Sequence, residues 1–457
     1  MRTSRLRPVL PLLLAVGAVG AAGCSDLTVP DYNNASLEDL ETRPTPTTVA
    51  QAATGMLIGA RTQMGAQNGY VSLLGILGRE SYNVDPADPR FITEMLIGPL
   101  DPGSPAFGGN LFALFYRDIR LGNTLLGALD RVAGMADADK EAVRGFVKTM
   151  QAHDFLMVIN TRDDLGAPID VGTDPTGPPA PIASTADVFA HIVQLLDEAR
   201  THLEAAGPQF PFALGPGFDG FDTPDTFLPF NRALKARVDV YMGNYAAALT
   251  SLGESFLDTD APLTLGVYHV YSTASGDVQN DLYDPSGRAI LAHPSIVTDA
   301  QHRADGSLDA RVGRKVARLD APHSVQGITT DVLFTVYGSN TAPIPIIRNE
   351  ELILLRAEAN IGLGDLPAAQ TDINFIRVNS GGLPPITLTD ADAALDELLY
   401  EKRYSLLFEG GHRWIDARRY GRLGTLPLAV STHTVQSRFP FPEAECLARS
   451  PTPPEGC

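Results

Sequence analysis

Glu401-Lys-Arg-Tyr-Ser-Leu-Leu-Phe-Glu-Gly-Gly-His-Arg-Trp-Ile-Asp-Ala-Arg-Arg-Tyr-Gly421 is the stretch that decides the fold of this 457-residue chain. It places three acids, five bases and the only tryptophan of the chain within about six helical turns. Large apolar residues such as Leu407, Phe408 and Ile415 lie among these charges. Charges beside apolar surface must be paired to be tolerated, so the stretch predicts a partly buried seam of ion pairs.

Three further segments upstream combine with this stretch into a recognisable pattern. They are Arg117-Asp-Ile-Arg-Leu-Gly-Asn123, Arg348-Asn-Glu-Glu-Leu-Ile-Leu-Leu-Arg-Ala-Glu-Ala359 and Ile373-Asn-Phe-Ile-Arg377. Together, and in this order, the four segments resemble the SusD/RagB family. The resemblance implies an outer-membrane lipoprotein that captures nutrients for a TonB-dependent transporter.

The resemblance also implies that the C-terminal motif packs the protein together. Its members are Glu401, Arg403, Glu409, Arg413, Trp414, Asp416 and Arg419. An exposed Trp414 could serve as a platform for a sugar, because aromatic faces offer a large apolar contact area. We favour core packing for Trp414 and a structural ion-pair network for the charged members.

The N-terminus has the features of an export signal. Basic residues at Arg2, Arg5 and Arg7 precede an apolar run over residues 9–22, which is too short for a stable membrane anchor. Small residues then lead to Cys24, which is typical of bacterial lipoproteins, although Ala21 stands where a leucine is usual. We expect residues 1–23 to be the signal and Cys24 to be lipidated; an ordinary signal with an incidental cysteine is the alternative.

The remaining cysteines, Cys446 and Cys457, lie close to the C-terminus. An exported chain meets oxidising conditions, so we expect a disulfide between them. No second Cys/His pair supports a metal site, and we expect neither metal nor cofactor.

The composition favours a folded, exported protein. Hydrophobic residues make up 44% of the chain and charged residues 19%, which excludes extensive disorder. The formal charge of −19 becomes −22 once the three signal arginines are removed. This balance argues against charge-driven binding to nucleic acid or to an anionic membrane surface.

Hydrophobic periodicity predicts a mainly α-helical chain. Residues 24–46 are polar and proline-rich, as expected of a tether, and residues 47–457 are expected to form one domain. Its helices are predicted mainly at 111–160, 186–257 and 350–422, apart from a Gly/Pro/Phe-rich insertion at 207–230. Residues 258–348 are rich in turn residues and predict a loop-rich lobe with a few short strands.

Two helix pairs share a turn that is typical of tetratricopeptide units. The turns are Gly243-Asn-Tyr-Ala-Ala-Ala248 and Gly364-Asp-Leu-Pro-Ala-Ala369, and a small residue, Ala236 or Ala357, precedes each final alanine by twelve positions. Such residues let two helices pack closely. One unit cannot bury its own apolar face, so further tetratricopeptide-like pairs are expected to build an α-helical body.

No arrangement of residues points to catalysis. The nine histidines are scattered, and neither a Gly-x-Ser-x-Gly motif nor a phosphate-binding glycine loop occurs. The adjacent acids Asp163-Asp164 and Glu350-Glu351 are expected by chance among 54 acids. The sequence therefore favours a protein that is not an enzyme.

The family resemblance implies a ligand site in loops of the irregular lobe and near the first helices. Side chains suited to oligosaccharide or peptide binding there are Arg79, Tyr82, Asn83, Tyr268, Tyr271 and Tyr283. A role in local structure is the alternative for each of them.

Three functions remain open from the sequence. The leading one is a non-catalytic outer-membrane lipoprotein, facing the cell surface, that binds oligosaccharide or peptide and passes it to a TonB-dependent transporter. The second is a scaffold that binds a protein partner in its tetratricopeptide-like groove. The third is a secreted glycosidase or peptidase.

Overall fold

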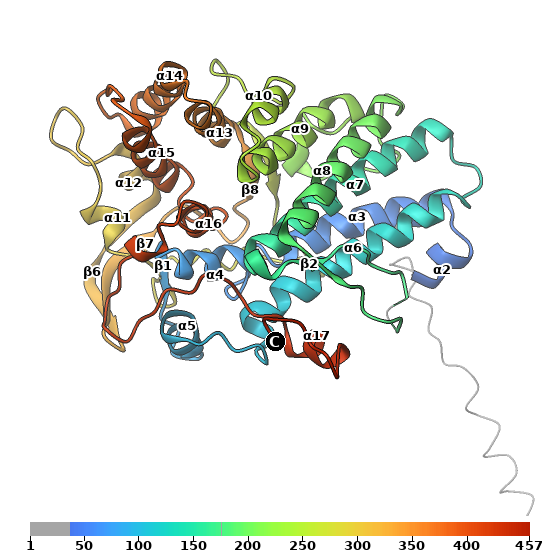
Figure 1. Ribbon diagram of the computed structural model, residues 1–457, viewed down its shortest axis with the longest axis horizontal. Coiled ribbons are helices and arrows are strands. Elements are labelled where there is room, and N and C mark those ends of the chain that lie inside the picture. The colour runs from blue at the N-terminus through green and yellow to red at the C-terminus, as the bar shows by residue number, and fades with distance from the viewer. Residues whose placement is uncertain (1–36, 175) are drawn as a thin grey trace, which may run out of the picture.

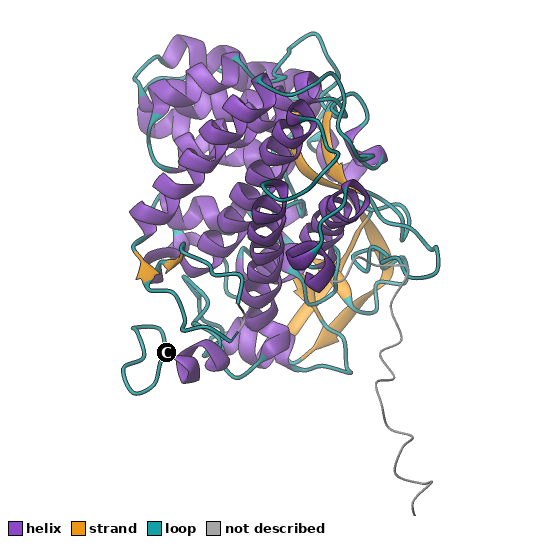
Figure 2. Ribbon diagram, turned by 90° about the vertical axis from the view of Figure 1, so that its right-hand side faces the viewer, coloured by secondary structure: helices purple, strands orange, loops and turns teal. Residues whose placement is uncertain are grey.

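The computed structural model describes residues 37–174 and 176–457. The predicted signal, the lipidation site Cys24 and most of the predicted tether lie outside the described residues. Helices make up most of the molecule (Figure 1), and most of the strands lie together on one side with further helices beside them (Figure 2). Within the described part of the chain, no helix is both long and apolar enough to cross a membrane.

The helical body follows the predicted segments closely. Its pairs include α7 with α8, α9 with α10 and α13 with α14, whose members pack against each other. The α-helices are α2 (Leu37–Thr42), α3 (Pro46–Thr62), α4 (Tyr70–Leu77), α5 (Arg90–Ile92), α6 (Asn110–Leu129), α7 (Asp137–Arg162), α8 (Thr185–Glu204), α9 (Pro224–Tyr241), α10 (Tyr245–Gly253), α11 (Ser295–Thr298), α12 (Ala310–Lys315), α13 (Asn349–Gly362), α14 (Leu366–Ile376), α15 (Ala391–Ser405), α16 (His412–Arg419) and α17 (Glu443–Ala448). Short 3-10 or π segments are η1 (Thr93–Ile97), η2 (Pro105–Gly109), η3 (Asp163–Leu165), η4 (Pro216–Phe218), η5 (Arg377–Gly381) and η6 (Leu423–Thr425).

The two tetratricopeptide-like turns have the expected conformation. Gly243 and Gly364 adopt φ values of 74° and 79°, which only glycine reaches without strain. The small residues Ala236 and Ala357 are fully buried, so the helices of each pair approach closely there. The mainly helical fold predicted from the sequence is confirmed.

Residues 258–348 are more ordered than predicted, because their strands pair with one another and with β1 from the N-terminal part. β1 (Ser81–Asn83), β5 (Ile290–Ala292), β7 (Ile328–Phe334) and β6 (Val316–Val325) form an antiparallel sheet in that order. β4 (Gly266–His269) pairs with β8 (Ile344–Arg348), and β2 (Ala167–Pro168) pairs with β3 (Ile182–Ala183), again antiparallel. Long-range pairing of this kind leaves little trace in local sequence.

Two predicted boundaries need correction. The expected tether is partly structured, because α2 occupies residues 37–42 and Leu40 is buried in the core. The expected insertion at 207–230 ends earlier, because α9 begins at Pro224. A capping box between Thr223 and Thr226 starts this helix, which then accommodates Pro229 in its second turn.

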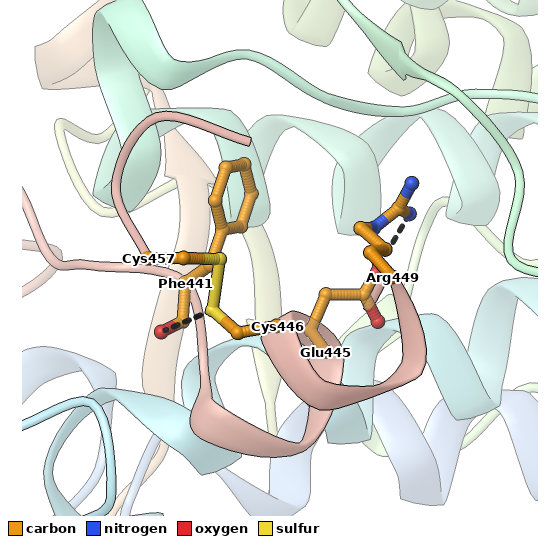
Figure 3. Close-up of a disulfide and its surroundings, with 5 residues drawn as sticks. All are labelled: Phe441, Glu445, Cys446, Arg449 and Cys457. Carbon is orange, nitrogen blue, oxygen red and sulfur yellow. Dashed lines mark hydrogen bonds and ion pairs between the residues drawn. A yellow bond between two sulfur atoms is a disulfide. The ribbon is translucent and has the colours of Figure 1, made fainter. Parts of the chain in front are cut away.

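The C-terminal cysteines are paired as expected. A disulfide joins Cys446 of α17 to Cys457 at the end of the chain, and the Cys446 sulfur lies beside the Phe441 carbonyl (Figure 3). Arg449 forms an ion pair with Glu445 on the same short helix. No residue of α17 is buried, so the disulfide fastens an exposed segment at the end of the chain.

Candidate ligand-binding groove

A groove with a volume of about 380 Å³ lies between the N-terminal helix α3 and the segment that begins in strand β4. We call it the Tyr268 groove. Its apolar walls come from α3 and from the loop that contains η4. The lining residues are Thr54, Leu57, Ile58, Arg61, Ala213, Leu214, Gly215, Pro216, Phe218, Tyr268, His269, Val270, Tyr271, Ser272 and Asp277.

Tyr268 occupies a central position because strand β4 holds its backbone. β4 pairs with β8, where Tyr268 lies opposite Pro345, and the Tyr268 hydroxyl donates to the carbonyl of Thr264. Tyr268 is half-buried and also lines a second cavity of about 400 Å³, with Arg314 and Asn379 on its wall. Tyr268 thus lies at the junction of an apolar and a polar cavity.

Tyr271 and an ion pair close one side of the groove. The Tyr271 hydroxyl donates to the Arg61 carbonyl over 3.1 Å, and only 6% of the residue is exposed. The Arg61 guanidinium donates to the Val270 carbonyl and pairs with Asp277. These contacts fix planar polar groups beside an apolar surface, which is the combination that binding sites for small ligands use.

A close approach between two segments shapes the opposite wall. A Cβ atom on Gly217 would lie 2.0 Å from the Tyr268 carbonyl oxygen, so only glycine fits at this position. Its neighbour Phe218 stacks on Phe227 of α9 with a centroid distance of 6.0 Å. The helical body thereby positions the η4 loop against β4.

His269 lines the groove, but its ring is buried. Burial lowers the pKa of His269 well below its usual value, so the imidazole is neutral. The ring packs edge-on against His153 at a centroid distance of 5.7 Å, and its Nε2 atom is buried without a hydrogen-bond partner among the described residues. Because that nitrogen is not exposed in the groove, His269 forms part of the wall and offers no polar group to a ligand.

Four of the six predicted ligand residues lie elsewhere. Arg79, Tyr82 and Asn83 are at most 1% exposed. Arg79 donates to the carbonyls of Ile76, Leu77, Pro427 and Thr434. Burial denies a ligand access to all three side chains, so we correct their assignment to structural roles.

Tyr283 is partly buried against the core and does not line the groove. Tyr268 and Tyr271 are therefore the predicted residues that the structure brings together.

The C-terminal motif forms buried ion pairs in three clusters. Glu401 pairs with Arg311 and Arg377, Glu409 pairs with Lys315 and Arg348, and Asp416 pairs with Lys402 and Arg419. Ser405 links the first two clusters, because its hydroxyl accepts from Arg311 and donates to Glu350. The adjacent acids Glu350 and Glu351 take separate partners, Arg348 and Arg237.

Two other members of the motif anchor neighbouring segments. Trp414 is fully buried, and its indole Nε1 donates to the Gln436 carbonyl over 2.8 Å. Arg403 pairs with Asp299 over 2.9 Å and also donates to Ser295. This geometry agrees with a packing role and gives a ligand no access to the Trp414 ring.

Sequence reasoning missed several residues that shape the groove. Arg61, Asp277 and Phe218 come from three distant segments, and none of them lies in a motif. The phenylalanine-rich segment 210–230 is the sequence feature that could have indicated Phe218. Within the described ranges, no three His, Cys, Asp or Glu residues are grouped so that they could hold a metal ion.

Comparison with known proteins agrees with these features. Residues 323–445 match the family model described as the SusD family. The fold resembles surface glycan-binding protein A from Bacteroides thetaiotaomicron in complex with laminarihexaose, with 13% identity, a TM-score of 0.68, and coverage of 89% of this chain and 98% of that one. It also resembles a laminarin-binding SusD-like protein, with 18% identity, a TM-score of 0.66, and coverage of 90% and 99%. A SusD-like carbohydrate-binding protein from Bacteroides fragilis shares 15% identity and a TM-score of 0.66 over 82% and 86% of the two chains.

No curated protein sequence matches the chain significantly. The family match covers the region that contains the ion-pair seam, and the fold extends the similarity over most of the chain. Residues 323–445 are thus similar to the SusD family, and the chain as a whole has the fold of SusD-like proteins.

Proposed function

We propose that the protein is a non-catalytic binding protein that captures an oligosaccharide in the Tyr268 groove. The observation that carries the proposal is the meeting of Tyr268, Tyr271 and the Arg61–Asp277 pair in one apolar groove. Aromatic and apolar surfaces take up the C–H faces of sugars, whereas planar polar groups bind their hydroxyls. The similar structures include a surface glycan-binding protein and a laminarin-binding protein, and this supports the ligand class.

The match of residues 323–445 to the SusD family supports a wider role in nutrient uptake. In this proposal Cys24 carries the lipid anchor, the protein faces outward from the outer membrane, and the ligand passes to a TonB-dependent transporter. Mass spectrometry of the membrane-extracted lipoprotein tests the lipid anchor and the transporter partner. The N-terminal peptide should carry acyl chains on Cys24, and a large β-barrel transporter should co-purify in near one-to-one ratio. Recovery without a transporter would refute the uptake role.

The ligand proposal is tested by titrating the full chain with neutral oligosaccharides of increasing length. Tyr268→Ala removes an aromatic surface in the groove and should weaken binding about tenfold, which corresponds to about 1.4 kcal/mol. Tyr283→Ala is the matched control, because this tyrosine is also partly buried but lies outside the groove. Equal losses in both variants, or none in Tyr268→Ala, would exclude the groove as the binding site.

A second function is favoured by one feature of the helical body. A cavity of about 410 Å³ lies beside the first tetratricopeptide-like turn, and its wall includes Tyr241, Met242 and Tyr245. Met242 is 36% exposed although it is large and apolar. Such a surface suits a protein partner, as in the scaffold hypothesis. A soluble partner that loses affinity for a Met242→Asp variant would support this function.

A further inference from the structure

A cavity in the C-terminal motif region has a different character from the Tyr268 groove. It has a volume of about 230 Å³ and lies between α15, α16 and the segment of residues 422–426. We call it the arginine cavity. Its lining residues are Asp396, Leu399, Tyr400, Lys402, Arg403, Arg413, Asp416, Ala417, Arg422, Thr425 and Leu426.

The wall of the arginine cavity has an excess of positive charge. Lys402, Arg403, Arg413 and Arg422 face two acids, Asp396 and Asp416. This gives the lining a formal charge of +2, although the whole chain carries −19.

Three of the four cations have carboxylate partners. Lys402 pairs with Glu358 and Asp416, Arg403 with Asp299, and Arg422 with Asp396. Arg413 has no ion pair among the residues that the structure describes. The excess charge of the wall therefore concentrates on Arg413.

Arg413 is also poor in hydrogen bonds. The described residues give its guanidinium one partner, the Arg79 carbonyl, at 2.8 Å from Nη1. A guanidinium has five N–H donors, and Arg413 is only partly buried and lines the cavity, so its remaining donors are available to a ligand there.

The acids near Arg413 do not neutralise its positive charge. Burial raises the pKa of Glu80 to about 7, so this acid is substantially protonated at neutral pH, and Asp299 is already paired with Arg403. Burial and, next in size, the like charge of Arg403 lower the pKa of Arg413 to about 9. An anion in the cavity would relieve this repulsion.

We propose that the arginine cavity binds an oxyanion, with Arg413 as its main ligand and Arg422 at the rim. Guanidinium N–H groups match the oxygens of carboxylate, phosphate and sulfate groups in charge and geometry. The side chain of Arg422 is 34% exposed and can turn from Asp396 toward an incoming anion. Leu399, Ala417 and Leu426 give the cavity apolar surface for the carbon atoms of an organic anion.

Isothermal titration of the full chain tests the site with three probes, inorganic phosphate, sulfate and acetate, at ionic strength held constant with chloride. Saturable one-site binding of at least one probe is expected. A preference for phosphate or sulfate would identify a tetrahedral oxyanion as the ligand, and a preference for acetate would identify a carboxylate. Absence of saturable binding for all three probes would overturn the proposal.

Variants place the binding in the arginine cavity. Arg413→Gln should weaken binding about tenfold or more, because it removes the charge-assisted hydrogen bonds to the anion. Asp396→Asn removes an exposed acid at the rim and should strengthen binding about two- to fivefold, whereas Arg422→Gln should weaken it by a similar factor. Arg318→Gln is the matched control, since this exposed arginine pairs with Asp331 on the distant hairpin.

The two rim variants keep the proposal testable if Arg413→Gln does not fold, because Asp396 is 61% exposed and Arg422 contributes only an exposed ion pair. If Asp396 and Arg422 only supported the structure, replacing them would not change the anion affinity in opposite directions. Unchanged affinity in both of them would overturn the proposal.

Discussion

Replacing Glu358 with glutamine tests whether the buried ion-pair seam stabilises the fold. Glu358 is 2% exposed and accepts hydrogen bonds from Lys402 (2.8 Å), Arg419 (2.8 Å) and Tyr420 (2.6 Å). Glutamine keeps the shape but removes the charge, so Lys402 and Arg419 would share Asp416 alone. Leaving buried charge without compensation costs about 3–5 kcal/mol.

The pKa of Glu358 leads to a similar magnitude. Burial alone would raise this pKa, but Lys402 and Arg419 outweigh burial and lower it from 4.5 to about 2. A fall in the pKa of this size corresponds to about 3 kcal/mol of folding stability at neutral pH. Because the folded-state pKa is depressed, this stability is present above pH 4.5 and is lost as the pH falls through 2.

Calorimetry at pH 7 measures the effect directly. An unfolding entropy of about 2.1 cal/mol/K per residue gives roughly 0.9 kcal/mol/K for a chain of this size. The expected fall in Tm for Glu358→Gln is therefore about 3–6 °C. Glu204→Gln is the matched control, because Glu204 forms an exposed ion pair with Arg200 and should change Tm little. An equal Tm for Glu358→Gln and the parent protein would refute the reasoning.

Three further predictions concern stability. Burial raises the pKa of Glu80 from 4.5 to about 7, so the stability from its protonated form is complete below pH 4.5 and is lost as the pH rises through 7. Glu80→Gln should therefore raise Tm at pH 8 and leave it nearly unchanged at pH 5; a lower Tm at pH 8 would contradict this. Trp414→Phe removes the hydrogen bond to the Gln436 carbonyl and leaves a cavity, and urea denaturation should show a loss of about 2–3 kcal/mol. Cys446→Ser should speed tryptic cleavage after Arg449 while Tm falls little, because α17 buries no residue; a large fall in Tm would show that the bridge supports the core.

The helical body could be predicted because its signals are local. The turn at Gly243 and the one at Gly364 require a positive φ, and the residues that pack beneath them recur at fixed spacing. The C-terminal motif could also be predicted from the sequence, because buried charges restrict which residues can occupy neighbouring positions. Both features depend on residues within one segment or within two adjacent helices.

The groove could be predicted only in part, because its walls come from distant segments. Arg61 reaches Asp277 across 216 residues, and Gly217 fits only because β4 passes beside it. Tyr268 and Tyr271 were identified from their residue type in a turn-rich region. The same criterion selected Tyr82, which β1 buries in the core. Residue type and loop position do not reveal burial when the burial depends on strand pairing.

Strand β8 connects the ion-pair seam to the groove. Arg348 at its end pairs with Glu409 of the C-terminal motif, and Pro345 lies opposite Tyr268 in the β4–β8 ladder. Within four residues, the same strand is therefore tied both to the seam and to the tyrosine that lines the groove. A weakened seam would loosen the register of β4 before it unfolds the helical body, because β4 has β8 as its one partner in this sheet. In the proposed function, the buried pair of Glu409 and Arg348 therefore affects ligand binding in the Tyr268 groove through the position of Tyr268, without contacting that ligand.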